Sequence, residues 1–118
     1  MLPQRIPKPP KRASRWRSRA HCDFVRDHAC CNCGSLSGIE VAHVRIGSGA
    51  GMGQKPDDWF TVSLCKECHM KQHRLGERTF WVDYAKYHGN TVQQLMDAYC
   101  KASPRAREIA EAKREREQ

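Results

Sequence analysis

The chain has 118 residues, a formal net charge of +8 and a pI of about 9.4. This length fits one small domain with tails, and small domains bury so little surface that many need a metal to fold. No apolar run approaches the roughly 18 residues that span a membrane, and the amino terminus lacks the apolar core of a signal peptide. We therefore expect a cytoplasmic protein with no membrane partner. The basic surplus favours nucleic acid as a partner, although a soluble basic protein without such a partner has the same composition.

The first segment, residues 1–19, carries positive charge and no acidic residue. Four prolines near its start prevent a regular helix. We expect a disordered arm that contacts phosphates, or else a tail that is merely solvated. Its basic residues are Arg5, Lys8, Lys11, Arg12, Arg15, Arg17 and Arg19.

The remaining chain predicts a mixture of short helices and two strands. Alternating apolar residues indicate the strands, and apolar residues at helical spacing indicate the helices. The last segment is so rich in Arg and Glu that a charged, exposed helix or a frayed tail is expected there. In order, the expected elements are a helix over 20–29, a strand over Ile39–Ile46, a glycine-rich loop over Gly47–Gly53, a strand over Trp59–Leu64, helices over Cys65–Leu75, Thr79–His88 and Thr91–Ala102, and the charged segment from Pro104.

Four of the seven cysteines form two Cys-x-x-Cys pairs, Cys30 with Cys33 and Cys65 with Cys68. Zinc binds four tetrahedral ligands, and two such pairs supply two thiolates each. Cys31 competes with Cys30, but only Cys30 leaves two residues before Cys33. In a reducing compartment paired cysteines bind metal more often than they form disulfides. The sequence thus predicts a closed structural zinc site.

Three histidines suggest a second, catalytic site. His69 and His73 lie four residues apart on a predicted helix, so both imidazoles share one face and can bind one metal. If the zinc site holds strand and helix together, His43 on the first strand can face this pair and activate water. The alternative is that His69 replaces a zinc ligand beside Cys68, with His43 and His73 as ordinary polar residues.

The glycine-rich loop does not fit either common nucleotide-binding pattern, because neither a Lys-Ser/Thr pair nor a strand–helix unit follows the required glycines. Its backbone amides can still surround a phosphate, with help from Arg45 and Lys55. Otherwise it is a flexible connection between the two strands.

Taken together, these motifs resemble the HNH endonucleases. The resemblance rests on Cys30-x-x-Cys33, Ala42-His43, the stretch GSGAGMGQKPDDW from Gly47 to Trp59, and SLCKECHMKQH from Ser63 to His73. It covers about residues 20–85 and is strongest to the phage recombination-enhancement, RecA-dependent nucleases and related prophage proteins. The fold that it implies is α+β, a small zinc-stabilised ββα-metal core with flanking helices. The implied divisions are a basic arm at 1–19, the nuclease core at 20–88 and a helical extension at 89–118.

The resemblance implies a metal-dependent endonuclease that hydrolyses DNA phosphodiester bonds with little sequence specificity, in phage or prophage recombination. His43 matches the general base, and His69 and His73 match positions that bind a catalytic Mg²⁺, Mn²⁺ or Zn²⁺. Arg45, Lys55, Lys71 and Arg74 are expected to neutralise DNA phosphates. The partners are DNA and a RecA-type recombinase filament.

Two positions depart from the usual HNH pattern. Ala42 stands where many members have a metal-binding Asp or His, and Phe60 stands where an Asn is common. Asp58 is therefore expected to supply a carboxylate to the catalytic metal. Two rival interpretations remain: a zinc-containing DNA-binding module without catalysis, and an interaction protein that presents Trp59, Phe80 and Trp81 to a partner.

Overall fold

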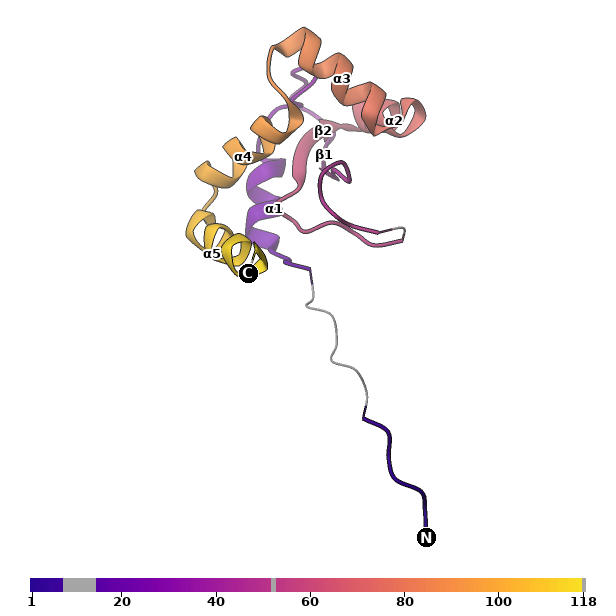
Figure 1. Cartoon of the computed structure of the whole chain (residues 1–118). Helices are drawn as coiled ribbons and strands as arrows, with labels where there is room; N and C mark the ends of the chain where they lie inside the picture. Colours follow the sequence, from indigo (N-terminus) through magenta and orange to yellow (C-terminus); the bar gives the residue numbers. More distant parts are fainter. Residues whose placement is uncertain (8–14, 52, 118) are drawn as a thin grey trace.

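The computed structural model describes residues 1–7, 15–51 and 53–117, and within them the chain is mixed α and β. Figure 1 shows a small two-stranded sheet surrounded by helices. The elements in order are α1 (Arg19–Arg26), β1 (Ile39–His43), β2 (Thr61–Cys65), α2 (Lys66–Leu75), α3 (Glu77–His88), α4 (Val92–Ala102) and α5 (Ala106–Glu117). The predicted α+β class is confirmed, and the charged carboxyl-terminal segment is a helix.

The two strands pair in antiparallel fashion, with Ile39 opposite Cys65 and His43 opposite Thr61. Because side chains alternate along a strand, residues 39, 41 and 43 share one face of the sheet with their partners, and residues 40 and 42 share the other. On the first face, the Ser63 hydroxyl donates to the Ala29 carbonyl and lies 2.6 Å from the Tyr99 hydroxyl of α4. On the second face, Glu40 reaches His69 of α2. Helices therefore cover both faces.

β1 is shorter than the predicted strand, which extended to Ile46. The Val44 amide still donates to the Phe60 carbonyl, but the next two amides leave the ladder. The Glu77 carboxylate at the start of α3 accepts from Arg45 N at 2.7 Å and from Ile46 N at 3.4 Å. Because these two amides bond to Glu77 and not to β2, the chain leaves the sheet immediately after Val44.

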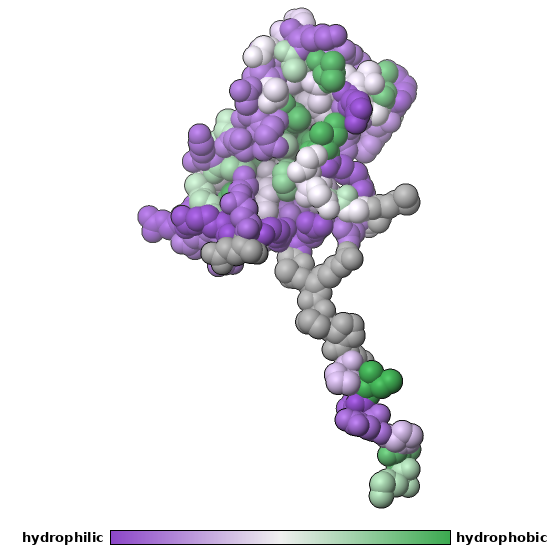
Figure 2. Space-filling model, in the orientation of Figure 1, coloured by the Kyte–Doolittle hydropathy of each residue, from purple (hydrophilic) through white to green (hydrophobic). Residues whose placement is uncertain are grey.

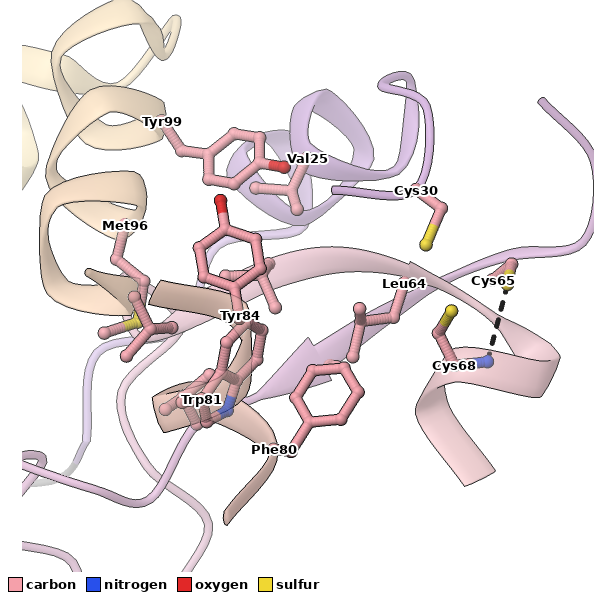
Figure 3. Packing of buried hydrophobic residues seen from close by; sticks show 14 residues of the cluster. Val25, Cys30, Leu64, Cys65, Cys68, Phe80, Trp81, Tyr84, Met96 and Tyr99 are labelled. Carbon is pink, nitrogen blue, oxygen red and sulfur yellow. Dashed lines mark hydrogen bonds between the residues drawn. The ribbon is translucent and has the colours of Figure 1, made fainter. Parts of the chain in front are cut away.

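The main core joins the sheet to α1, α3 and α4. Leu64 points toward Phe80, and Tyr99 lies beside Val25 (Figure 3). Met96 of α4 is 1% exposed in this same cluster. Residues on both sides of the predicted division at residue 88 therefore share one core.

Trp59, Phe80 and Trp81 are all buried. These three aromatic residues therefore do not form the exposed surface that the interaction-protein interpretation requires. Hydrophilic residues dominate the face of the body seen in Figure 2, with a few apolar residues among them. Among the described residues no helix has both the length and the apolar character needed to cross a bilayer.

The predicted basic arm is shorter than residues 1–19. Residues 1–7 have no secondary structure and are exposed, and residues 8–14 lie outside the described part of the chain. Residues 15–18, by contrast, pack on the body. Trp16 stacks on Trp59 with ring centroids 5.6 Å apart, and its indole N–H donates to Glu108 of α5. A small second cluster around Trp59, Cys100 and Ile109 explains this packing.

Candidate metal centre and histidine site

The four predicted cysteines converge at one point. The sulfur atoms of Cys30, Cys33, Cys65 and Cys68 all lie within 4.8 Å of one another, and Cys33 Sγ is 3.6 Å from Cys65 Sγ. Zinc–thiolate bonds of about 2.3 Å in a tetrahedron place sulfurs about 3.8 Å apart. The geometry therefore fits a structural metal such as zinc, and Figure 3 shows Cys30, Cys65 and Cys68 turned toward one another.

Each cysteine pair is built by local hydrogen bonds. In the first, the Gly34 amide donates to the Cys30 carbonyl at 2.9 Å, and the positive φ of Gly34, 80°, turns the chain back. That backbone angle favours glycine over any residue with a Cβ. In the second, Cys65 caps α2, because its sulfur accepts from the Cys68 amide at 3.4 Å. The Cys31 amide donates to Ser63 O, which fixes the first pair to β2.

The electrostatics of the cluster suit a cation. Burial raises the pKa of Cys30, but hydrogen bonds from the backbone N–H groups of Cys33, Cys65 and Asn32 outweigh it and bring the pKa to about 7. Burial, with the neighbouring thiols, raises the pKa of Cys68 to about 12. The Cys30 thiolate thus forms readily and the Cys68 thiolate does not, and a divalent cation would favour loss of the Cys68 proton.

Cys31 is not part of the site, and burial raises its pKa strongly. The choice of Cys30 over Cys31 is confirmed. Two more cysteines also lie outside the cluster. Cys100 is buried, while burial followed by the charge of Asp58 raises the pKa of half-buried Cys22 to about 11, so this thiol stays protonated and unreactive at neutral pH.

His43 lies at the end of β1 and pairs with Asp58. His43 Nε2 is 2.9 Å from Asp58 Oδ1, and their side chains are only 17% and 8% exposed. Burial by itself raises the pKa of Asp58, but hydrogen bonds from His43 and the Ser18 amide, with the nearby charge of Arg17, lower it below its usual value. An ionised carboxylate only accepts hydrogen bonds, so Nε2 carries the proton. Nδ1 of His43 has no hydrogen-bond partner among the described residues.

The other two histidines lie on the opposite side of the sheet. His69 Nδ1 is 3.0 Å from a Glu40 carboxylate oxygen, and the rings of His69 and His73 lie 4.8 Å apart on α2. Glu40 and His43 lie three positions apart on β1, so strand alternation places them on different faces. His43 therefore meets Asp58 rather than the His69–His73 pair, contrary to the expected juxtaposition.

The expected second metal set is likewise not assembled. Among the described residues, the four cysteines are the only group of three or more potential metal ligands. Asp58, expected to bind the catalytic metal, instead accepts hydrogen bonds from His43 and Ser18. The alternative in which His69 replaces Cys68 as a zinc ligand also finds no support, because His69 pairs with Glu40.

The four residues expected to contact DNA are exposed. Lys55, Lys71 and Arg74 form no ion pair with any described residue, whereas Arg45 donates from its guanidinium to the Gly51 carbonyl. Arg45 and Lys55 lie on the connection between β1 and β2, and Lys71 and Arg74 lie on α2. Cations without an internal partner remain available to an external anion.

Several residues that hold these side chains in place were not predicted from the sequence. Asp57, directly before Asp58, is 1% exposed at its side chain and accepts from the Trp16 amide at 2.6 Å and from Arg116 at 2.6 Å. Glu40 pairs with His69, and His21 is completely buried against Ser103. Trp16 was the available signal, since a large aromatic residue within a basic segment indicates packing rather than a solvated tail.

Comparison with known proteins gives one family. No curated protein and no solved structure matches the chain. A family model described as a protein of unknown function, DUF968, matches residues 3–103. This match includes the cysteine cluster, the His43–Asp58 pair, α2, α3 and all of α4. Because it spans most of the chain, the protein belongs to the DUF968 family.

Proposed function

We propose that this protein is a metal-dependent endonuclease of the HNH type that hydrolyses DNA phosphodiester bonds, with His43 as the general base. The observation that carries the proposal is the His43–Asp58 pair at the end of β1. A buried carboxylate holds one nitrogen of the imidazole at 2.9 Å and leaves the other nitrogen as an acceptor. This is the arrangement that a histidine needs to take a proton from water.

The surrounding elements are consistent with this proposal. β1, β2 and α2 follow one another as a strand, strand and helix, and the cysteine cluster joins the segment before β1 to the junction of β2 and α2. The HNH resemblance implies this order of elements. The cluster in this account is structural, because four thiolates leave a zinc ion no open position for water or substrate.

The proposed chemistry at His43 is a single proton transfer. Neutral His43 accepts a proton from water at Nδ1, and the water oxygen forms a bond to phosphorus as the bond from phosphorus to the 3′ oxygen breaks. Asp58 accepts a hydrogen bond from Nε2–H throughout and stabilises the positive imidazolium that results. Lys55, Lys71 and Arg74 offer charge to neighbouring phosphates but present no visible means of reading base edges, so little sequence specificity follows.

His69 and His73 are the residues that fit a catalytic divalent metal. Glu40 holds Nδ1 of His69 and so leaves its Nε2 for a metal, and a carboxylate behind a ligating histidine is common in metal sites. A divalent ion held by this pair would polarise a phosphate and stabilise a departing oxygen. Because the pair and His43 lie on opposite faces of the sheet, this role requires the DNA to reach both faces at once. Asp58 is not needed in this set, because its role here is to orient His43.

One observation favours a second candidate, a zinc-containing DNA-binding module without catalysis. His43 and the His69–His73 pair lie on different faces of the sheet, and no third ligand joins the two helix histidines among the described residues. The module needs only the cysteine cluster and the exposed basic residues. A context in phage recombination, with a RecA-type filament as a partner, rests on the resemblance alone.

The test of the nuclease proposal is plasmid nicking by wild-type protein and the His43→Ala variant. Supercoiled plasmid is incubated with Mg²⁺, Mn²⁺ or Zn²⁺, with and without a RecA-type filament. Loss of a general base costs roughly 10²–10⁴-fold in rate, and we expect His43→Ala to lose this much while it keeps its fold and zinc.

The matched control is His28→Ala, which removes an exposed histidine that follows α1, bonds to the Phe24 carbonyl and packs edge-on against Phe24 and Tyr99. This variant should nick at the wild-type rate. Equal nicking by wild type and His43→Ala, or no nicking by wild type under any condition, would contradict the proposal and favour the module.

A further inference from the structure

A short segment, Arg15 to Ser18, runs alongside the two adjacent carboxylates Asp57 and Asp58, and we call it the strap. Its backbone alternates contacts with these two residues. The Trp16 amide donates to Asp57 Oδ1 at 2.6 Å, the Asp58 amide donates to the Trp16 carbonyl at 3.0 Å, and the Ser18 amide donates to Asp58 Oδ2 at 2.7 Å. The strap thus pairs with the segment that contains Asp58, the hydrogen-bond partner of His43.

The strap contacts both oxygens of the Asp58 carboxylate. Oδ2 accepts from the Ser18 amide, while Oδ1 accepts from His43 and lies 3.4 Å from the Arg17 guanidinium. Ser18 is also the N-cap of α1, so the positive end of that helix dipole adjoins the carboxylate. With both oxygens occupied, the carboxylate has one orientation, and that orientation presents Oδ1 to the imidazole.

The strap is itself held in place on both sides. Trp16 stacks on Trp59 and donates from its indole to Glu108 of α5. The Arg17 guanidinium donates to the backbone carbonyls of Lys55, at 2.9 Å, and Pro56. These contacts come from segments far apart in the chain, so displacing the strap requires several interactions to break together.

We propose that the strap is a positioning element for His43, in which Arg17 and the Ser18 amide orient Asp58 so that the imidazole keeps its proton on Nε2 and its base on Nδ1. Arg17 acts through Asp58 and does not touch the substrate. The effect on DNA cleavage rests on the proposed nuclease function, whereas the effect on the imidazole does not depend on it.

The test compares Arg17→Gln with a matched control, Arg26→Gln. Both variants remove one positive charge beside α1, but Arg26 pairs only with exposed Asp23, at 2.7 Å. Zinc-loaded full-length protein with ¹⁵N-labelled histidine gives the tautomer of His43 from its two ring-nitrogen shifts, and plasmid nicking gives kcat and KM for each variant.

We expect His43 to be a single Nε2–H tautomer in the wild type and in Arg26→Gln, and a mixture of tautomers in Arg17→Gln. We expect kcat of Arg17→Gln to fall roughly tenfold with KM unchanged, as for the loss of other residues that orient a functional histidine. If Arg17 served only as a phosphate contact of a basic arm, KM would rise instead and the tautomer would stay fixed.

Two outcomes overturn the proposal: identical His43 spectra in all three proteins, or a change in KM alone. If Arg17→Gln does not fold, as judged by circular dichroism, Arg17→Lys is measured in its place and must show the same tautomer mixture in milder form. A wild-type protein that never nicks DNA defeats the nuclease function, but the His43 spectra still decide the role of the strap.

Discussion

Asp57 and Asp58 are adjacent in the chain, but their carboxylates bind different partners. Asp57 binds the Trp16 amide, Arg15 and Arg116, whereas Asp58 binds His43, Arg17 and the Ser18 amide. The first carboxylate therefore joins the strap to α5, and the second holds the imidazole. Two consecutive carboxylates thus bind different parts of the molecule.

The Asp58→Asn variant tests the role of the carboxylate at this scale. An amide in place of the carboxylate can donate to Nε2, which favours the tautomer whose Nδ1 is protonated and cannot act as a base. We expect nicking to slow by roughly 10²–10⁴-fold while zinc and fold are retained, as when an orienting aspartate is lost elsewhere.

Nicking rate and the His43 ring-nitrogen shifts measure this effect. Asp83→Asn on α3, whose carboxylate pairs with no described residue, makes the same chemical change and should leave both unaltered. Wild-type nicking by Asp58→Asn would show that His43 works without this partner.

The cysteine ligands were predictable from spacing, but the partner of His43 was not. Two Cys-x-x-Cys pairs indicate metal binding from the sequence alone, because the spacing within each pair brings two sulfurs together. The position of His43 depends instead on which face of β1 the helix α2 covers. The Glu40–His69 contact settles that question, and it is a tertiary contact that local sequence does not specify.

At the scale of elements, α4 belongs to the core although it follows the region of HNH resemblance. Its apolar residues Val92, Leu95, Met96 and Tyr99 recur at helical spacing, and they pack in the cluster that contains Leu64. The start of α4 was predictable, because Thr91 and Gln94 form a reciprocal capping box there. By contrast, the helix expected over 20–29 ends at Arg26, and the helix expected from Thr79 begins at Glu77. The end of β1 and the position of the strap were not predictable from local sequence, because they depend on hydrogen bonds to Glu77 and Asp57, which lie far away in the chain.

Met96→Ala tests whether α4 stabilises the sheet. Truncation of a buried methionine costs about 2–5 kcal/mol, because apolar contacts are lost and a cavity remains. Met70→Ala on α2 makes the same change at a side chain that is 63% exposed, and it should alter stability by less than about 0.5 kcal/mol. The free energy of unfolding in urea measures both variants. An effect of Met96→Ala as small as that of Met70→Ala would mean that α4 is a separate extension.

His21 links α1 to the turn between α4 and α5, and it predicts a pH dependence. It is completely buried, and its Nδ1 lies 2.8 Å from the Ser103 hydroxyl. Burial lowers the pKa of His21, the charge of Asp58 opposes this shift, and the charge of Lys113 adds to it. The unfolded chain therefore binds a proton at a higher pH than the folded protein does. Stability from this residue is complete above the ordinary pKa of about 6.5 and is lost as the pH falls below it.

Urea unfolding at pH values from 7.5 to 5.5 tests this dependence in wild type and His21→Gln. We expect the unfolding free energy of the wild type to fall more steeply, because glutamine can bond to Ser103 but does not titrate. The cysteines are the same in both proteins, so any loss of zinc affects them equally. Parallel curves would show that His21 does not carry the pH dependence.

At the scale of the whole molecule, the cysteine cluster joins segments that are far apart in the chain. It connects the segment after α1 to the end of β2 and the start of α2, in a chain whose two strands have only five residues each. A sheet of this size is marginal by itself. Length, charge and cysteine spacing together predict a small, basic, metal-stabilised protein, and the HNH resemblance adds the α+β class. The close packing of the strap and α5 around Trp59 depends instead on contacts between distant residues.

We propose that the cysteine cluster is structural and that catalysis takes place at His43 with a second metal. The most direct measurement is a metal count made on the same dialysed sample that is assayed for nicking of duplex, single-stranded and branched DNA. The account predicts one tightly held zinc per chain, and nicking that begins when Mg²⁺ or Mn²⁺ is added and is lost in His69→Ala/His73→Ala. One tight zinc with no nicking of any DNA in any divalent metal would contradict it and leave the DNA-binding module as the function.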